Sequence, residues 1–502
     1  MTGRRDVLRA AGAVAMAQAL GGCDAIASHL SHALGGDIPD HVDRPRAASV
    51  DPARHLLDRA AFGPWPGDVE RVRSMGEAGW LDEQLTPARI DDAACRVRTA
   101  RIDTVGVSPR AAFEWRPEVL ERQLVTYTLL EAVYSKRQLE QVMVHFWTDH
   151  FNVAIGKSSC RSLKTIDDRE VVRRHALGSF RELLGASARS PAMLVYLDGR
   201  ASDGGPGARP NENYARELLE LHTLGVDGGY TQRDVMEAAR CLTGWVVRDE
   251  RALVGLGRAE PAPERHDDGD KTVLGVTIPA GGGAERDLDR LLDVLVAHAS
   301  CARFVATKLC RHFIADDPPR SAVDAAAAVF AHTGGSIAPV VRSILDSDDF
   351  RASAGAKLKR PFRLVVSMLR ALGADTHARE GLAEALAAMG HAPFQHPTPE
   401  GYPDRAAPWL GTLLFRWNLA TALVEGRLPG VSVDLPRLAA ALGEPGADPI
   451  ARARTLGAHL LGRSLDADEE RVVRTYLASP SGRERPERAV ALILSSPGYQ
   501  WS

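Results

Sequence analysis

Cysteine is scarce in this 502-residue chain, and its six copies show neither a C-x-x-C pair nor a zinc-type spacing. Once the N-terminal Cys23 is set aside, the remaining number is odd, which argues against a complete set of disulfides. The absence of C-x-x-C-H also excludes a c-type haem site, and no cysteine zinc site is expected. We therefore expect structural thiols at Cys95, Cys160, Cys241, Cys301 and Cys310.

A charge excess and long apolar runs are also absent from the sequence, and aromatic residues are few. Lys and Arg total 62 against 65 for Asp and Glu, so no basic excess attracts nucleic acid. No internal run of about 20 apolar residues exists, so no transmembrane helix is expected after the N-terminus. Aromatics make up only 6%, while Ala, Leu and Arg are plentiful, which favours helix over sheet.

Sequence motifs for several common chemistries are missing as well. There is no G-x-S-x-G elbow, no Walker A sequence and no G-x-G-x-x-G that opens a helix after a strand. Nothing therefore supports serine-nucleophile or nucleotide chemistry. Residues 197–207 (LDGRASDGGPG) are rich in Asp and Gly, but they lack the D-x-[DN]-x-[DN]-G pattern of an EF-hand calcium loop.

The chain opens with MTGRRDVLRAAGAVAMAQALGGCDA, which has the features of an export signal. Arg4 and Arg5 form a twin-arginine pair before a weakly apolar stretch, residues 10–20, that is too short to span a bilayer. The sequence LGGC that ends at Cys23 resembles a lipobox. A plain signal peptide, or a chance Arg-Arg pair before a small-residue helix, is the alternative.

From these features we predict a Tat-type signal peptide over residues 1–22 and lipidation at Cys23. The lipid anchor would hold the protein at the periplasmic face of the cell membrane. Asp24, directly after the lipidated residue, favours the inner membrane. We expect no nucleic-acid partner.

The rest of the chain divides into a tether and one large domain. Residues 23–50 are punctuated by Gly, Pro, His and Asp, and we interpret them as the tether. Over residues 51–500, apolar residues recur with a period near 3.6, and only residues 271–279 (KTVLGVTIP) look like a strand or hairpin. The predicted fold class is mainly α, a multi-helix globular domain with long Gly/Pro-rich loops and at most a minor β-hairpin. If it has two subdomains, the break lies near residues 248–275.

Residues 209–245 (RPNENYARELLELHTLGVDGGYTQRDVMEAARCLTGW) concentrate polar side chains at the start of a predicted helix. Asn211 fits the N-cap and Gly225 the C-terminal stop. At 100° per residue one arc of this helix carries Glu212, Asn213, Arg216, Glu217 and Glu220. This arc is either a site or a surface ion-pair ladder. His222 falls on the opposite, leucine-rich side and is interpreted as a satisfied core histidine.

A second helix follows, with Thr231 and Asp234 in capping-box spacing and a stop at Gly244. The two helices form an αα-hairpin, across which Arg240 is placed to meet Glu217 or Glu220. The connecting loop is too long for a DNA-reading helix-turn-helix, and an anchored exported protein has no access to chromosomal DNA.

Two other stretches carry candidate residues. In residues 136–153, His150 shares a face with Leu139, Met143 and Phe146, while His145 and Asp149 have an i, i+4 spacing compatible with two metal ligands. A packed helix with a polar shoulder is the alternative, and we slightly prefer it. Residues 264–275 place His266, Asp267 and Lys271 in one loop, for which exposed charge is the alternative.

Several blocks resemble one protein family, among them HFWTDHFNV, RPNENYARELLELHTLGVDGGYTQRDVMEAARCLTGW, HDDGDKTVLG, KLKRPFRLVVSMLRALG and HPTPEGYPDRAAPWL. They occur in order across about residues 52–500 and are similar to the bacterial family catalogued as domain of unknown function 1800. The resemblance implies export, often by Tat, and a gene beside a second exported family, domain of unknown function 1501, which resembles the alkaline phosphatase and sulfatase fold. It implies no activity.

The resemblance makes a mere surface ladder on the first hairpin helix less plausible and leaves two readings of its polar arc open. In the first, the protein is an envelope enzyme, an acid/base or metal-assisted hydrolase whose cofactor would be a divalent metal ion. Its candidate catalytic residues are Glu212, Arg216, Glu217, Glu220 and Arg240. Its candidate substrate-binding residues are Asn211, Asn213, His150, His266, Asp267 and Lys271.

In the second reading the protein is a non-enzymatic binding partner of the co-encoded phosphatase-like protein. The polar arc would then be a buried, fully satisfied network that keeps the hairpin rigid. A Tat-exported redox protein is a third reading, but the sequence has no haem or C-x-x-C site to support it.

Overall fold

The computed structural model describes residues 23–42, 49–248, 255–446 and 448–502. Helices dominate these ranges, and the β-structure within them consists of three small two-stranded sheets. The predicted mainly α fold class is therefore confirmed. None of the helices in this part of the chain is long and apolar enough to cross a membrane. The predicted signal peptide, residues 1–22, lies outside the described residues.

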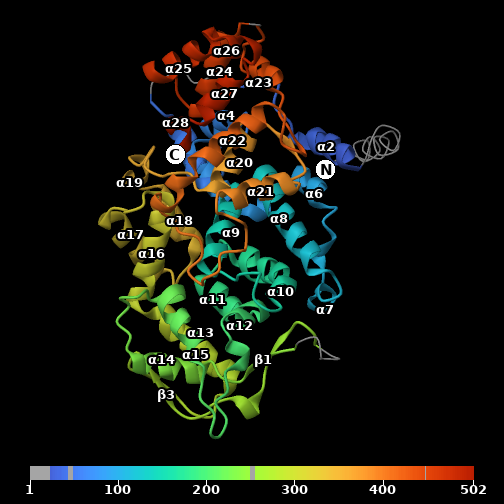
Figure 1. The fold of residues 1–502 in the computed structure, drawn as a ribbon. Helices are drawn as coiled ribbons and strands as arrows, with labels where there is room; N and C mark the ends of the chain where they lie inside the picture. Colours follow the sequence, from blue (N-terminus) through green and yellow to red (C-terminus); the bar gives the residue numbers. More distant parts are fainter. Residues whose placement is uncertain (1–22, 43–48, 249–254, 447) are drawn as a thin grey trace.

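The helices of the first half of the chain run from one end of an elongated molecule towards the other (Figure 1). They are α2 (Cys23–Ser31), α3 (Pro52–Ala60), α4 (Asp68–Met75), α5 (Glu77–Gln84), α6 (Ala93–Thr99), α7 (Pro109–Ala112), α8 (Pro117–Tyr134), α9 (Gln138–His150), α10 (Cys160–Asp167), α11 (Phe180–Ala188) and α12 (Pro191–Tyr196). The far end contains α13 (Glu212–Glu217), α14 (Gln232–Cys241), β1 (Trp245–Val247), β2 (Ala259–Pro261), β3 (Lys271–Val273), β4 (Val276–Ile278) and α15 (Gly283–Ala297).

The second half returns along the molecule, and its last helices form the opposite end (Figure 1). The returning elements are α16 (Ala299–Phe313), α17 (Arg320–His332), α18 (Ile337–Leu345), α19 (Asp348–Arg351), α20 (Pro361–Ala371), β5 (Asp375–Thr376) and α21 (Glu380–Ala388). The end is built from α22 (Leu413–Val424), β6 (Val431–Ser432), α23 (Leu435–Ala441), α24 (Pro449–Leu461), α25 (Ala467–Ala478), α26 (Pro480–Glu484), α27 (Arg488–Leu494) and α28 (Pro497–Gln500).

One hydrophobic core runs through the whole molecule, from Ile38 to Tyr499. Val273, at the end of the proposed break near residues 248–275, is part of this core. The predicted hairpin is present, with Lys271 paired to Ile278 in the antiparallel β3–β4 sheet. The five cysteines expected to be structural thiols are buried and free.

Helix α9 lies near the middle of the molecule and contacts α3, α5 and α8. Its apolar residues recur so closely that almost the whole helix is buried, including Leu139, Met143 and Trp147. The one strip that faces partly outwards holds His145 and Asp149. The buried body of α9 therefore fixes the position of these two polar side chains.

The predicted hairpin of residues 212–242 forms, with a change inside its first helix. Asn211 caps α13 by accepting from the Asn213 N–H, and Thr231 forms the predicted capping box with Asp234. After Glu217, however, the helix widens into a π-helix, η6 (Leu218–Thr223). The Thr223 hydroxyl donates to the Leu218 carbonyl at 2.7 Å, which adds a side-chain hydrogen bond across the wider turn.

The segment predicted as a tether is partly folded onto the domain. Residues 23–31 form α2, and Ser31 accepts from Arg98 Nε at 2.9 Å. Further along, Ile38 and Val42 are buried, and the Val42 N–H donates to the Ala441 carbonyl. Gly35, one of the residues that indicated a flexible linker, has a φ of +84° at a kink in this segment.

The loop after α21, residues 391–405, crosses the end of α9 and is held along its length. Asn152 donates to the carbonyls of His396 and Thr398, at 2.9 and 2.8 Å. Tyr196 donates to the Pro397 carbonyl at 2.8 Å. Gly401 has a φ of +72° and lies so close to Asp149 that a Cβ there would overlap the Asp149 carbonyl.

We predict that Gly401→Ala lowers the free energy of unfolding more than the control Gly390→Ala. Both glycines have positive φ, which costs alanine about 1–2 kcal/mol, but a Cβ at Gly390 meets nothing within 4 Å. The overlap at Gly401 should cost a further ~1–3 kcal/mol. Thermal unfolding of the two variants measures the difference, and equal losses would show that the loop does not press on α9.

Candidate functional site

A small cavity, here the central pocket, lies where α9, α8 and the 391–405 loop meet. Its volume is about 30 Å³. One water molecule needs about 10–15 Å³ of such volume, so the pocket has room for two or three waters. It is lined by Phe62, Thr128, Ala132, Gln141, Val144, His145, Thr148, Asp149, Arg173, Phe362, His391, Pro393, Phe394 and Tyr402.

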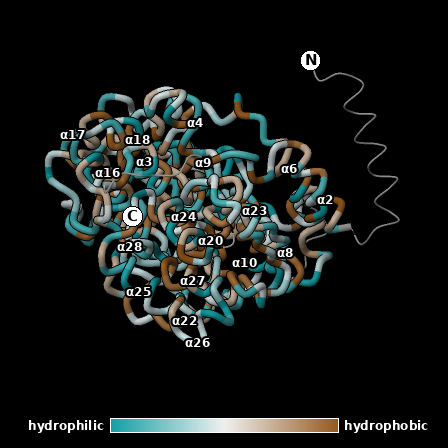
Figure 2. The backbone as a smooth tube through the Cα atoms, turned by 90° about the horizontal axis from the view of Figure 1, so that it is seen from above, coloured by the Kyte–Doolittle hydropathy of each residue, from teal (hydrophilic) through white to brown (hydrophobic). Residues whose placement is uncertain are grey.

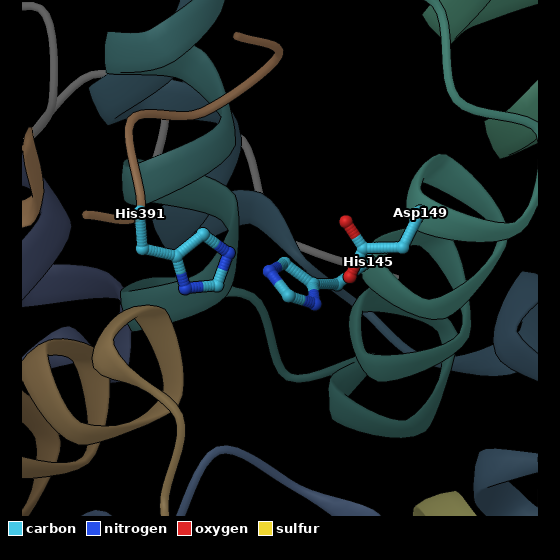
Figure 3. Close-up of side chains that lie close together, drawn as sticks. All are labelled: His145, Asp149 and His391. Carbon is cyan, nitrogen blue, oxygen red and sulfur yellow. The ribbon is translucent and has the colours of Figure 1, made fainter. Parts of the chain in front are cut away.

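Three potential ligand or acid/base groups converge in this pocket. His145 and Asp149 come from successive turns of α9, and His391 comes from the start of the 391–405 loop. One nitrogen or oxygen of each side chain lies within 4.8 Å of the other two. Figure 3 shows the two imidazole rings pointing toward each other, with the Asp149 carboxylate beside His145. This arrangement could hold a metal ion or work as an acid/base group.

The hydrogen bonds on the far side of each ring decide where its proton lies. Arg360 Nη2 is 3.2 Å from His145 Nδ1, and the Phe362 N–H donates to His391 Nδ1 at 3.3 Å. A guanidinium and a backbone amide only donate, so both Nδ1 atoms must be acceptors. Burial, together with the charge of Arg360, holds the pKa of both histidines well below its ordinary value. Both rings are therefore neutral and carry the proton on Nε2, facing the pocket.

Asp149 is held as a carboxylate that accepts two hydrogen bonds. Arg360 Nη1 donates to Asp149 Oδ2 at 2.7 Å, and the Tyr402 N–H donates to the same carboxylate. Burial raises the pKa of Asp149 above that of an ordinary aspartate, although Arg360 offsets part of the effect. A carboxylate with a raised pKa is a stronger base than one exposed to water.

A second layer of charges holds Arg360 in place. Its Nε is 3.7 Å from Asp404 Oδ1, and Asp404 also binds Lys357 Nζ at 3.1 Å and His312 Nδ1 at 2.7 Å. Burial alone would raise the pKa of Asp404, but these cations and His312 outweigh it and hold the pKa well below the usual range. Burial lowers the pKa of His312 to about 4, so this ring is neutral and donates from Nδ1.

The predicted polar arc on α13 lies at the surface rather than in the central pocket. Arg216 binds Glu212 at 3.1 Å and Gln232 at 3.2 Å, so this part of the arc is an ion-pair ladder. Glu220 accepts from the Tyr230 hydroxyl at 3.4 Å. Burial, and then the charges of Glu220 and Glu400, raise the pKa of Glu217.

The two asparagines of the same block take part in local backbone contacts. Asn211 is the N-cap of α13, and Asn213 Nδ2 donates to the Leu197 carbonyl at 3.1 Å. These contacts fix the start of the hairpin against the preceding loop.

Four other predicted residues meet one another, but away from α13. Arg240 binds both oxygens of Asp267, at 2.7 and 3.0 Å, and also Glu237, instead of Glu217 or Glu220. His266 and Lys271 both bind Asp287 of α15. His266 and Lys271 are buried, so the alternative of exposed charge is wrong for them. The group forms a network that ties the loop and β3 to α14 and α15, and within the described residues Asp287 Oδ1 is left without a hydrogen-bond partner.

His150 and His222 lie against each other inside the protein. His150 Nε2 is 3.1 Å from the His222 carbonyl, and both side chains are buried among aromatic rings such as Phe151. Neither ring nitrogen of His222 has a hydrogen-bond partner among the described residues, so the expectation of a satisfied histidine is wrong. Burial lowers its pKa to about 3 and keeps it neutral.

Three residues that complete the cluster around His145 and Asp149 were not predicted from the sequence. His391, Arg360 and Asp404 were given no role, although Arg360 and Asp404 stand in two of the family-like blocks, KLKRPFR and GYPDRAAPWL. The spacing of His145 and Asp149 is compatible with two metal ligands, although a packed helix with a polar shoulder was the preferred interpretation. Only the fold brings His391 to them.

A second group with metal-ligand atoms close together is Asp92, Cys95 and Glu131. Asp92 already accepts from the Ser135 hydroxyl at 2.7 Å and from the Lys136 N–H at 2.8 Å. Burial raises the pKa of both Cys95 and Glu131, which opposes the deprotonated forms that a metal needs. The central pocket is therefore the stronger candidate site.

The buried ion pairs of Asp287 with His266 and Lys271 lead to a prediction about stability. Asp287→Ala leaves the buried Lys271 without its carboxylate, so the free energy of unfolding should fall by roughly 3–5 kcal/mol. Asp268→Ala removes an exposed carboxylate from the same loop and serves as the control. Chemical denaturation of both variants tests this, and a similar small effect of the two would mean that the network does not stabilise the fold.

Comparison with known proteins agrees with the resemblance seen in the sequence. The model of the family described as Protein of unknown function (DUF1800) matches residues 55–501. No curated protein and no solved structure matches the chain. The matched range includes every residue of the central pocket. This protein therefore belongs to the DUF1800 family.

Proposed function

We propose that this protein is an exported, membrane-anchored hydrolase of the cell envelope with an acid/base centre in the central pocket. The observation that carries the proposal is the convergence of His145, Asp149 and His391 on one cavity. Perturbed acidic and imidazole groups gathered in a cavity are typical of catalytic sites.

In this proposal Asp149 is the general base. It takes a proton from a water molecule in the pocket, and its raised pKa suits that role. The Nε2–H groups of His145 and His391 donate to the oxygen on which negative charge develops when the water attacks. Arg360 positions Asp149 and His145 together, because it binds both.

A metal-assisted mechanism would use the same three side chains. Asp149 and the two Nε2 atoms would then be the ligands of a divalent ion. Each Nε2 would first have to lose its proton, and the cation would lie beside the Arg360 guanidinium. These two costs make the acid/base form the better fit to the observed hydrogen bonds.

Export and anchoring support the assignment to the envelope from the sequence alone. The twin-arginine pair and the lipobox-like LGGC that ends at Cys23 are the basis for Tat export and lipidation. We propose the periplasmic face of the inner membrane as the location.

A non-enzymatic role as a partner of the co-encoded phosphatase-like protein is the second candidate. Helix α22 lies at the rim of the molecule in the view of Figure 2, and exposed apolar side chains on it and just before it favour this role. Leu410, Leu413, Leu414 and Trp417 follow an i, i+3, i+4, i+7 spacing there and are all exposed. Exposed apolar surface of this kind is typical of interaction sites.

The first test is hydrolysis of chromogenic esters and phosphoesters by the full chain. His391→Ala should lower kcat/KM by about 10²–10⁴-fold, the usual contribution of an acid/base group. The control His396→Ala removes a histidine of the same loop that lies outside the lining of the central pocket; its ring contacts Thr398 and Tyr402. It should leave the rate unchanged.

Elemental analysis of the same preparations separates the mechanisms. The acid/base form expects no stoichiometric metal. Stoichiometric metal that is lost in His391→Ala would establish the metal-assisted form instead. If no substrate turns over and no metal is found, the partner role becomes the better explanation.

The pH dependence of kcat/KM provides a second prediction. The rate should fall as the pH drops through the pKa of Asp149, because only the ionised carboxylate accepts a proton. Arg360→Gln removes the neighbouring cation, so that pKa should rise further and the acidic limb should move to higher pH. An unmoved limb, or one shifted to lower pH, would exclude Asp149 as the base.

A further inference from the structure

Two polar atoms at the central pocket have no hydrogen-bond partner among the described residues. Thr128 Oγ1, from α8, and Arg173 Nη2, from the π-helix η4 (Asp168–Arg173), are buried. Neither has a hydrogen-bond partner within the described part of the chain, and both residues line the central pocket. Buried donors without partners are rare in native proteins, because each costs free energy.

The other two nitrogens of the Arg173 guanidinium each have a hydrogen-bond partner. Its Nε binds Asp168 at 2.6 Å and its Nη1 donates to Gln141 Oε1 at 2.8 Å. These two bonds hold the guanidinium plane in place, and Nη2 is the nitrogen without a partner among the described residues. The arginine is therefore fixed before any ligand arrives.

The donors of the pocket come from several directions. Thr128 lies on α8, Arg173 on η4, His145 on α9 and His391 on the 391–405 loop. The nearby carboxylates bind arginines through Oδ2, Asp168 to Arg173 and Asp149 to Arg360. Asp168 Oδ1 has no partner among the described residues, but Asp168 lies outside the lining of the central pocket. A group that could satisfy such donors must carry several acceptor oxygens pointing in different directions.

We propose that the central pocket binds a tetrahedral oxyanion, the phosphoryl or sulfuryl group of a substrate. This builds on the hydrolase proposal, because it names the group that enters the site. The volume of the pocket, about 30 Å³, admits a group of two or three waters' size and excludes the rest of the substrate. Tetrahedral oxyanions are recognised by such sets of Arg, His and hydroxyl donors.

With a phosphate monoester in the pocket, the reaction is a simple hydrolysis. The water oxygen forms a new bond to phosphorus, and the bond from phosphorus to the ester oxygen breaks. The water proton passes to Asp149 and from there to the leaving alkoxide. The donors around the oxyanion stabilise its charge as the bonds exchange.

Titration calorimetry of the full chain with inorganic phosphate tests the proposal. Thr128→Val removes a hydroxyl that has no protein partner, so the fold should be unaffected, while phosphate affinity should fall about ten- to a hundredfold. The control Thr165→Val removes another buried, unpartnered hydroxyl that does not line the pocket. It should bind phosphate as the wild type does.

Competition identifies the class of anion. Sulfate should displace phosphate, whereas acetate, which is planar, should not. No binding at millimolar phosphate, or equal binding by wild type and Thr128→Val, would overturn the proposal. If neutral esters are hydrolysed without phosphate binding, the hydrolase proposal holds and the oxyanion-binding proposal fails. If phosphate binds but no ester is turned over, oxyanion binding holds and the hydrolase proposal fails.

Discussion

The buried guanidinium of Arg360 is the interaction on which the candidate site depends. It binds Asp149, contacts His145 Nδ1 and lies beside Asp404, so one side chain joins α9 to the 391–405 loop. A buried cation is stable only when its donors are matched by carboxylates and acceptors. Arg360 has such acceptors in Asp149 and Asp404. Because the guanidinium can only donate to His145 Nδ1, it also fixes the proton of that ring on Nε2.

Two polar clusters in the same protein differ in which groups lack a hydrogen-bond partner. In the group around Asp287, His266 and Lys271 both bind Oδ2 of the carboxylate, and its Oδ1 has no partner among the described residues. In the central pocket it is donors that lack partners, among them Thr128 Oγ1 and Arg173 Nη2. The buried ion pairs of Asp287 stabilise the fold, whereas unsatisfied donors around a cavity point to a ligand, since water or a substrate group must meet them.

Local features of the sequence could be predicted well because they depend on neighbouring residues. The cap at Asn211, the capping box at Thr231 and the β3–β4 hairpin all follow from short-range hydrogen bonding and turn geometry. The prediction failed where a distant contact intervened. The predicted tether lies partly on the domain, since Ile38 and Val42 find apolar partners there that no local pattern reveals.

The mainly α class, the family membership and the spacing of His145 and Asp149 one turn apart on a helix can be read from the sequence. These properties follow from helical periodicity and from residues that are neighbours along the chain. That His391 and Arg360 join that pair, and that the carboxylates of α13 do not, depends on the tertiary fold. The physical reason is that a site assembled from separate segments depends on how the core packs them together, and packing has no local signature in the sequence.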